Sequence, residues 1–201
     1  YLIENYSYDK IMVVGYSLGG NMTLKYFGEH VKTISDKVSC GVAISVPVDL
    51  ASSSRTMGTS KNKIYMYKFL RSLRKKILIK NQKYPDYQLD IKKLLKSKTF
   101  KEFDGLYTAP VSGFSGPEDY WEKASSKPYL TSIKKPVLLI TSSDDPFLAQ
   151  ECYPFKEAEE SNYFYLEVTK YGGHVGFISS LFSKNNRWLE NRILQFIKDN
   201  G

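Results

Sequence analysis

A serine flanked by glycines lies near the start of the chain, in the run Gly15-Tyr16-Ser17-Leu18-Gly19-Gly20. The run matches the pattern Gly-x-Ser-x-Gly, and it stands between a short apolar stretch and a segment with helical spacing. This context predicts a tight strand-to-helix turn that holds the serine hydroxyl clear of a sheet. We expect glycine both two before and two after Ser17, because side chains at those positions would collide. Ser17 is the candidate nucleophile.

The helix after Ser17 points its first backbone N–H groups at the serine, so the N–H of Leu18 is the candidate donor to an oxyanion formed during acyl transfer. A phosphate-binding loop is the alternative interpretation of this glycine-rich turn. Neither the lysine of a P-loop nor a Gly-x-Gly-x-x-Gly pattern accompanies it.

A serine hydroxyl needs a base to take its proton, and a histidine oriented by a carboxylate is the usual solution. The chain has two histidines, His30 and His174. His30 ends the helix that follows Ser17, so we expect it to lie away from the serine. His174 stands in a glycine-rich loop, which suits the unusual backbone angles needed to bring an imidazole over Ser17. His174 is the candidate base.

An acid is expected between the serine and the histidine in chain order, directly after a strand. Asp144 and Asp145 both stand there, before Pro146. We favour Asp145, because a carboxylate directly before proline is the more usual acid in such sequences. Asp144 stays the alternative acid, or else caps the next helix or supports the loop. The chemistry implied is nucleophilic acyl transfer, with neither a metal nor an organic cofactor.

Alternating apolar strands and amphipathic helices must position these residues. Each strand candidate is a short apolar run of the kind found in parallel sheets, and the first looks buried on both faces. Strands alternating with helices predict an α/β fold with a mostly parallel sheet. The expected strands cover residues 10–15, 38–48, 136–141 and 163–169, and the expected helices cover 21–28, 146–158 and 185–198.

The stretch 49–135 is too long for a simple crossover, so we expect a helical cap or lid, with 1–48 and 136–201 as the core. Amphipathic helices are expected at 64–79 and 89–98. From 61 to 101 there are fourteen Lys or Arg against two Asp, or +12, which leaves −4 of the net +8 for the remainder. This basic segment is either a solvated helical face or a surface for anionic lipid headgroups or acidic partners. It contains no recognised nucleic-acid-binding motif, so we expect no nucleic-acid partner.

The composition, with 42% hydrophobic residues among 201, is that of a folded domain. Cys40 and Cys152 lie far apart and form no zinc motif, and Cys40 is expected as a buried free thiol, as in a reducing compartment. No stretch is long and apolar enough to span a membrane, and the first residues show neither an initiator Met nor a signal peptide. We therefore expect the chain to begin in mid-protein. Its location stays open between the cytoplasm and a membrane surface.

Taken together, these residues resemble the YheT-like group of α/β-hydrolases, which includes yeast ethyl ester synthase/esterases and animal phospholipase-like members. The resemblance covers essentially the whole chain. It implies esters with medium-length acyl chains, or glycerolipid esters, as substrates, with hydrolysis or transfer to an alcohol by the same acyl-enzyme. It is carried by Gly15-Tyr-Ser-Leu-Gly-Gly-Asn21, Ser45-Val-Pro-Val-Asp-Leu50, Phe103-Asp104, Gly113-Phe114, Asp119-Tyr-Trp121, Ala124-Ser125, Asp144-Asp-Pro-Phe147, Gly172-Gly-His-Val-Gly-Phe177 and Trp188-Leu-Glu190.

One departure from the group concerns what precedes the serine turn. The resemblance implies further strands there, one of whose loops supplies a second oxyanion N–H. Without them the sheet has an exposed edge, which invites pairing with other strands. We therefore expect either a missing N-terminal half or a self-association partner, and a non-catalytic scaffold is the rival to an enzyme.

Overall fold

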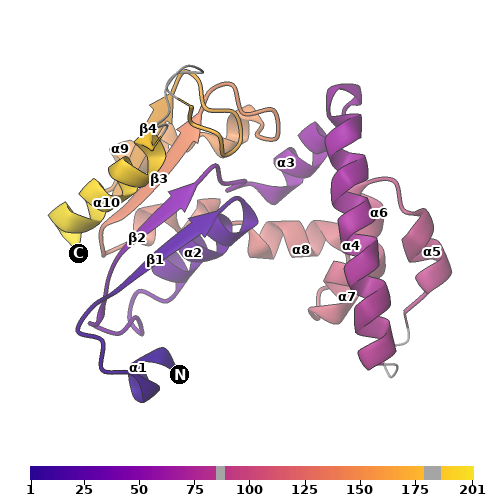
Figure 1. Cartoon of the computed structure of the whole chain (residues 1–201), viewed down its shortest axis with the longest axis horizontal. Helices are drawn as coiled ribbons and strands as arrows, with labels where there is room; N and C mark the ends of the chain where they lie inside the picture. The colour runs from indigo at the N-terminus through magenta and orange to yellow at the C-terminus, as the bar shows by residue number, and fades with distance from the viewer. Residues whose placement is uncertain (85–88, 179–186) are drawn as a thin grey trace. The chain divides into compact units, whose positions relative to one another are not determined.

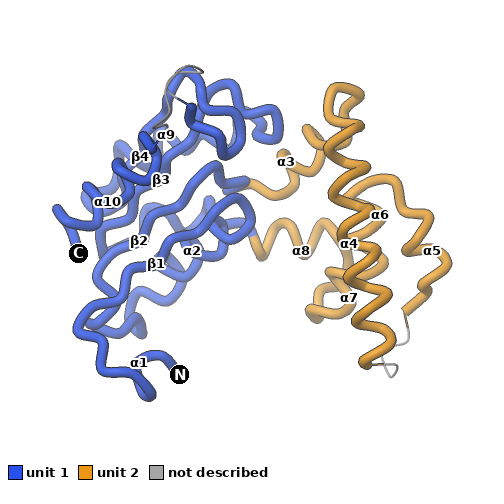
Figure 2. Tube along the Cα trace, in the orientation of Figure 1, with its two compact units in different colours: residues 1–48, 125–201 blue, residues 49–124 orange. Residues whose placement is uncertain are grey.

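The computed structural model describes residues 1–84, 89–178 and 187–201. The chain forms two compact units (Figure 2). Unit 1 comprises Tyr1–Val48 and Ser125–Gly201, and unit 2 comprises Asp49–Ala124. Each unit is described separately below.

Unit 1 contains a four-stranded sheet in the order β1-β2-β3-β4, with every neighbouring pair parallel. The strands are β1 (Ile11–Tyr16), β2 (Val38–Ile44), β3 (Val137–Ser142) and β4 (Phe164–Thr169). All four predicted strands are confirmed, although β2 ends before its predicted end at residue 48. It ends because Ser45 has φ 51°, which takes the backbone out of the extended conformation. Because the strands are parallel, their carboxyl ends share one edge of the sheet.

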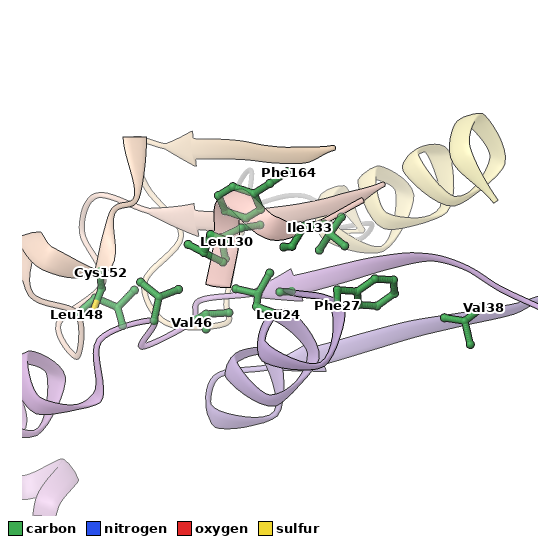
Figure 3. Close-up of a cluster of buried hydrophobic side chains, with 13 residues drawn as sticks. Leu24, Phe27, Val38, Val46, Leu130, Ile133, Leu148, Cys152 and Phe164 are labelled. Carbon is green, nitrogen blue, oxygen red and sulfur yellow. The ribbon is translucent and has the colours of Figure 1, made fainter. Parts of the chain in front are cut away.

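Helices cover both faces of this sheet (Figure 1). On one face α2 (Leu18–Glu29), the 3₁₀ helix η3 (Lys127–Ser132) and α9 (Phe155–Glu159) accompany a core that includes Leu24, Phe27 and Phe164 (Figure 3). On the other face α10 (Trp188–Asn200) packs Leu189, Ile193 and Phe196 against alternate residues of β2 and β3. The predicted α/β architecture is confirmed as a sheet between two helical layers.

The β1 strand differs from the prediction of a strand buried on both faces. Gly15 is its only buried residue, whereas Met12, Val14 and Tyr16 are exposed. In the part of the chain that the structure describes, β1 pairs with β2 alone and is an edge strand. The expected exposed edge is therefore present. Burial alternates along β1 because successive side chains point to opposite faces of the sheet, and the face with residues 12, 14 and 16 is exposed.

One predicted helix is wrong, and the predicted start of another cannot be compared with the described residues. Residues 146–158 form not one helix but the 3₁₀ turn η4 (Gln150–Cys152) and α9, separated at Pro154, whose ring nitrogen has no hydrogen to donate. The last helix, α10, begins at Trp188, and the predicted start at residue 185 lies outside the described residues. The short α1 (Leu2–Asn5) precedes β1.

Unit 2 is helical. It contains α3 (Leu50–Met57), η1 (Ser60–Asn62), α4 (Lys63–Lys83), α5 (Ile91–Lys96), α6 (Phe100–Phe103), the π-helical η2 (Asp104–Thr108), α7 (Ala109–Val111) and α8 (Pro117–Ala124). The predicted insertion ran to residue 135, but residues 125–135 belong to unit 1. Leu130 and Ile133 in this segment are fully buried in the core that includes Leu24 and Phe27 of α2. No helix within the described ranges has the length and apolar character to cross a bilayer. That unit 2 acts as a cap stays a prediction.

Candidate active site

Ser17 occupies the turn between β1 and α2, in a strained conformation with φ 51° and ψ −121°. Its backbone N–H donates to the carbonyl oxygen of Ile44 on β2 at 2.8 Å, and its own carbonyl accepts from Asn21 N at 3.1 Å. These bonds anchor the turn to the sheet and to the helix. Backbone strain of this kind persists only where the surroundings over-determine it, and it is concentrated at functional sites.

The glycines around Ser17 have different roles. A Cβ atom on Gly15 would lie 2.5 Å from the carbonyl oxygen of Gly19 and from Thr23 Oγ1, and one on Gly20 would lie 2.5 Å from Val46 Cγ2. A Cβ on Gly19 would meet nothing within 4 Å. The expected collision two residues after Ser17 is therefore wrong. The close packing of α2 on the sheet requires glycine at Gly20 instead.

Asp145 and His174 form a hydrogen-bonded pair. The distance from Asp145 Oδ2 to His174 Nδ1 is 2.8 Å, and the side chain of Asp145 is fully buried while that of His174 is 14% exposed. Asp145 Oδ1 accepts from the backbone N–H of Phe147 at 2.9 Å, so both carboxylate oxygens are occupied. The Phe147 ring lies 4.5 Å from the imidazole, centroid to centroid. The imidazole is thus held by a carboxylate at Nδ1 and by an aromatic ring at its side.

Asp144 acts on the backbone of the histidine loop instead of on the imidazole. Its Oδ1 accepts from Gly173 N at 2.8 Å, and Ser142 Oγ donates to the carbonyl of Gly173 at 2.7 Å. Desolvation acts to raise the pKa of Asp144, but the hydrogen bonds from Gly173 and neighbouring groups outweigh it and hold that pKa below its ordinary value. Gly173 has φ +56°, where a side chain would be strained. Of the two carboxylates considered, the structure therefore places Asp145, and not Asp144, on His174.

Tyr153 supports the end of β3, directly before the loop that carries Asp144 and Asp145. Its hydroxyl donates to the carbonyl of Ser142 at 2.8 Å. Burial, with the neighbouring charge of Asp145, raises the pKa of Tyr153 to about 12, so the hydroxyl keeps its proton at neutral pH. Sequence reasoning missed both Tyr153 and Ser142, because an isolated tyrosine or serine has no pattern that marks it as a support.

The carboxyl ends of the strands bring the candidate residues to one edge of the sheet. Ser17 follows β1, Asp145 follows β3, and His174 follows β4. Within the described residues no hydrogen bond joins Ser17 to His174; such bonds often tighten only when substrate is present. The N–H of Leu18 belongs to the first turn of α2, where backbone donors have no intrahelical acceptor.

His30 lies at the other end of α2, as predicted. It follows the last residue of this 12-residue helix, which spans about 18 Å. Its side chain is 54% exposed, and the distance from His30 Nε2 to Glu29 Oε2 is 3.8 Å. His30 is therefore remote from the serine turn.

Two further expectations concern the cysteines and metal binding. Cys40 and Cys152 are both buried, and Cys40 is a free thiol, as expected. Burial is the main reason that the pKa of Cys40 is raised. Among the residues with described positions, no three His, Cys, Asp or Glu side chains are arranged to hold a metal ion.

Comparison with known proteins identifies the fold family. The family model described as "alpha/beta hydrolase fold" matches residues 1–181. The chain is 31% identical to the putative esterase YheT of Escherichia coli, over 96% of this chain and 56% of that protein. It is 28% identical to a monoacylglycerol lipase of Saccharomyces cerevisiae, over 94% and 42% of the two chains, and 26% identical to human phospholipase ABHD3, over 93% and 45%.

The chain thus spans about half the length of the curated relatives it matches. Among solved structures, an esterase of Pyrococcus furiosus superposes with a TM-score of 0.55 at 23% identity, over 98% of this chain and 57% of that one, which supports the fold. The relatives include the YheT-like esterase whose motifs the sequence resembles, so that resemblance is confirmed. The chain belongs to the α/β-hydrolase fold family.

Proposed function

We propose that this chain carries the catalytic residues of a serine hydrolase that acts on carboxylic esters. Ser17 is the nucleophile, His174 the general base and then the general acid, and Asp145 the residue that orients the imidazole. The observation that carries the proposal is the 2.8 Å contact between Asp145 and His174 at the sheet edge where Ser17 is held in a strained turn. The combination of nucleophile, base and orienting acid is what acyl transfer requires.

In the first half of the reaction, Ser17 Oγ attacks the ester carbonyl carbon and its proton passes to His174 Nε2. Asp145 Oδ2 keeps the other imidazole proton on Nδ1, so that Nε2 is free to accept. The negative charge on the carbonyl oxygen is stabilised by the N–H of Leu18 and by the positive end of α2. The tetrahedral intermediate then expels the alcohol, which takes its proton from His174.

In the second half, water attacks the acyl-enzyme and gives a proton to His174, and Ser17 recovers its proton as the acid leaves. An alcohol in place of water would yield a new ester by the same steps. Leu18 is one oxyanion donor, and in similar enzymes the lack of one donor lowers the rate on the order of 10²–10³-fold. Activity therefore has to be measured both in this chain and in the longest natural protein that contains this sequence.

The names of the relatives favour lipid-like substrates. They are an esterase, a monoacylglycerol lipase and a phospholipase. We therefore propose medium-chain acyl esters or glycerolipid esters as the substrate class.

The test combines active-site labelling with turnover. A fluorophosphonate probe should label the protein, and labelling should disappear in Ser17→Ala but persist in Ser60→Ala, an exposed serine of unit 2. Hydrolysis of p-nitrophenyl esters from acetyl to dodecanoyl should peak at medium chains and vanish in Ser17→Ala. His174→Gln should abolish turnover, whereas the matched variant His30→Gln should keep it, because His30 lies at the far end of α2.

Each remaining outcome has a distinct meaning. Labelling of this chain with turnover only in such a longer protein would support the triad and assign the missing rate to a second oxyanion donor. Ester synthesis on addition of ethanol would extend the proposal to acyl transfer. Neither labelling nor turnover in either protein would refute the proposal in favour of a non-catalytic scaffold.

A further inference from the structure

The longest helix of unit 2, α4, has an unusual charge pattern. Its 21 residues include eight Lys or Arg and no Asp or Glu. The acid-free stretch is longer than the helix, because no acidic residue occurs between Asp49 and Asp86. Acids three or four positions from a basic residue stabilise a helix, and α4 contains no acid that could form such a pair within it.

One face of α4 packs within unit 2. Met66, Leu70 and Ile77 are its buried residues. Two of its cations also have partners in this unit: Arg74 donates to the carbonyl of Ser97, and Lys80 lies over the ring of Tyr107. This face therefore accounts for the packing of the helix and for part of its charge.

The opposite face carries an exposed stripe. Ile64, Lys68, Arg71, Lys75 and Ile79 are all exposed, and they follow one another at spacings of four, three, four and four. That spacing places them on one side of a helix, over a length of about 22 Å. We call these five residues the α4 outer face. Within the described residues, none of its three cations forms an ion pair with an acid.

Large apolar side chains are exposed along with these cations. Ile64, at one end of the stripe, is 70% exposed, and Ile79, at the other end, is also exposed. Tyr67, about one turn after Ile64, is 60% exposed. Contact with water alone would explain the cations of this face but not the isoleucines at its two ends. A face that binds nucleic-acid phosphates would use the cations and leave the isoleucines unexplained.

We propose that the α4 outer face docks on the surface of an anionic phospholipid bilayer. The lysines and arginine would meet the headgroup phosphates and carboxylates, while the two isoleucines and Tyr67 would enter the boundary of the acyl region. Amphipathic helices with cations and apolar residues bind bilayer surfaces through this combination of charge and apolar burial. The proposal goes beyond the ester chemistry and does not depend on it, since binding needs no catalytic residue.

Vesicle co-sedimentation tests the proposal with the intact chain and with Ser17→Ala, which removes hydrolysis as a variable. Binding is expected to vesicles of phosphatidylcholine with about one third phosphatidylserine, to be weaker on phosphatidylcholine alone, and to fall as salt is added. A Lys or Arg near an anionic surface contributes about fivefold in affinity, so Lys68→Gln, Arg71→Gln and Lys75→Gln together should weaken binding by about 100-fold.

The matched control removes three cations from unit 1, in Lys32→Gln, Lys134→Gln and Lys198→Gln. These lysines are also exposed, and the loss of net charge is the same. A second variant, Ile64→Ser with Ile79→Ser, should weaken vesicle binding yet keep its salt dependence. Both positions are exposed, so the fold should survive, and circular dichroism checks this.

Three results would overturn the proposal. Equal binding to neutral and anionic vesicles is one, and equal losses in the α4 and control triples is another, because net charge alone would then explain the attraction. The third is tight binding of a DNA or RNA duplex through the same cations with no binding to anionic vesicles, which would make the face a nucleic-acid surface.

Discussion

Replacement of Asp145 by Asn should nearly abolish ester hydrolysis while leaving the fold intact. Asp145 uses both oxygens, one for the backbone N–H of Phe147 and the other for His174 Nδ1. An asparagine has only one oxygen, and that oxygen must face Phe147, since a second N–H there would leave two donors in contact. Its amide nitrogen then donates to Nδ1, which moves the imidazole proton to Nε2.

An imidazole with its proton on Nε2 cannot accept the proton of Ser17. In other serine hydrolases the wrong tautomer lowers kcat on the order of 10⁴-fold. The matched variant is Asp144→Asn, which changes the neighbouring carboxylate in the same way. Its amide oxygen can still accept from Gly173, so this exposed hydrogen bond is weakened but kept. The cost cannot exceed the net worth of such a bond, about 0.5–1.5 kcal/mol, so we expect a decrease of about tenfold at most.

The assay is steady-state hydrolysis of a medium-chain p-nitrophenyl ester by both variants, with urea unfolding to confirm that each is folded. The expected ratio between the two variants is at least about 10³ in kcat. The reasoning is refuted if Asp145→Asn keeps activity within tenfold of the wild type, or if Asp144→Asn is the more damaging change.

Two further predictions concern stability. Gly20→Ala should destabilise the chain by about 1–3 kcal/mol, because its Cβ would lie 2.5 Å from Val46 Cγ2, whereas Gly19→Ala, with open space around its Cβ, should be neutral or slightly stabilising. Urea unfolding distinguishes these outcomes, and equal effects at both positions would contradict the packing argument. In unit 2, burial raises the pKa of Asp104 above its ordinary value of 3.8, despite its hydrogen bond from Trp121 Nε1. The folded state therefore binds the proton more tightly, and this contribution to stability is complete below pH 3.8 and is lost as the pH rises through the raised pKa. Asp104→Asn should lack this loss, and a stability difference between the two proteins that does not change with pH would argue against it.

Much of the candidate site could be predicted from local patterns. The turn around Ser17 follows from glycines between an apolar strand and a helix, and the order serine, acid, histidine follows from where strands end. Such patterns report backbone conformation over a few residues, and backbone conformation is what periodicity and glycine spacing encode. The strands at 136–141 and 163–169 were predicted to within a residue at each end for the same reason.

The remaining features depend on contacts between distant segments. Asp144 and Asp145 have the same chemistry and adjacent positions. Only the folded loop after β4 brings His174 to Asp145 and Gly173 to Asp144. The exposure of β1 also depends on its neighbours. An apolar strand has the same sequence pattern at the edge of a sheet as in the middle, so the pattern cannot predict its exposure.

The sequence by itself therefore determined the α/β class, the serine turn and the order of the three candidate residues. Only the tertiary structure decided which carboxylate contacts the imidazole and which glycine the packing of α2 requires. It alone also showed that Tyr153 bonds to Ser142, and that Ser142 bonds to Gly173 in the histidine loop. The physical reason is that local spacing constrains the backbone, whereas the partner of a side chain is set by segments that are far away along the chain.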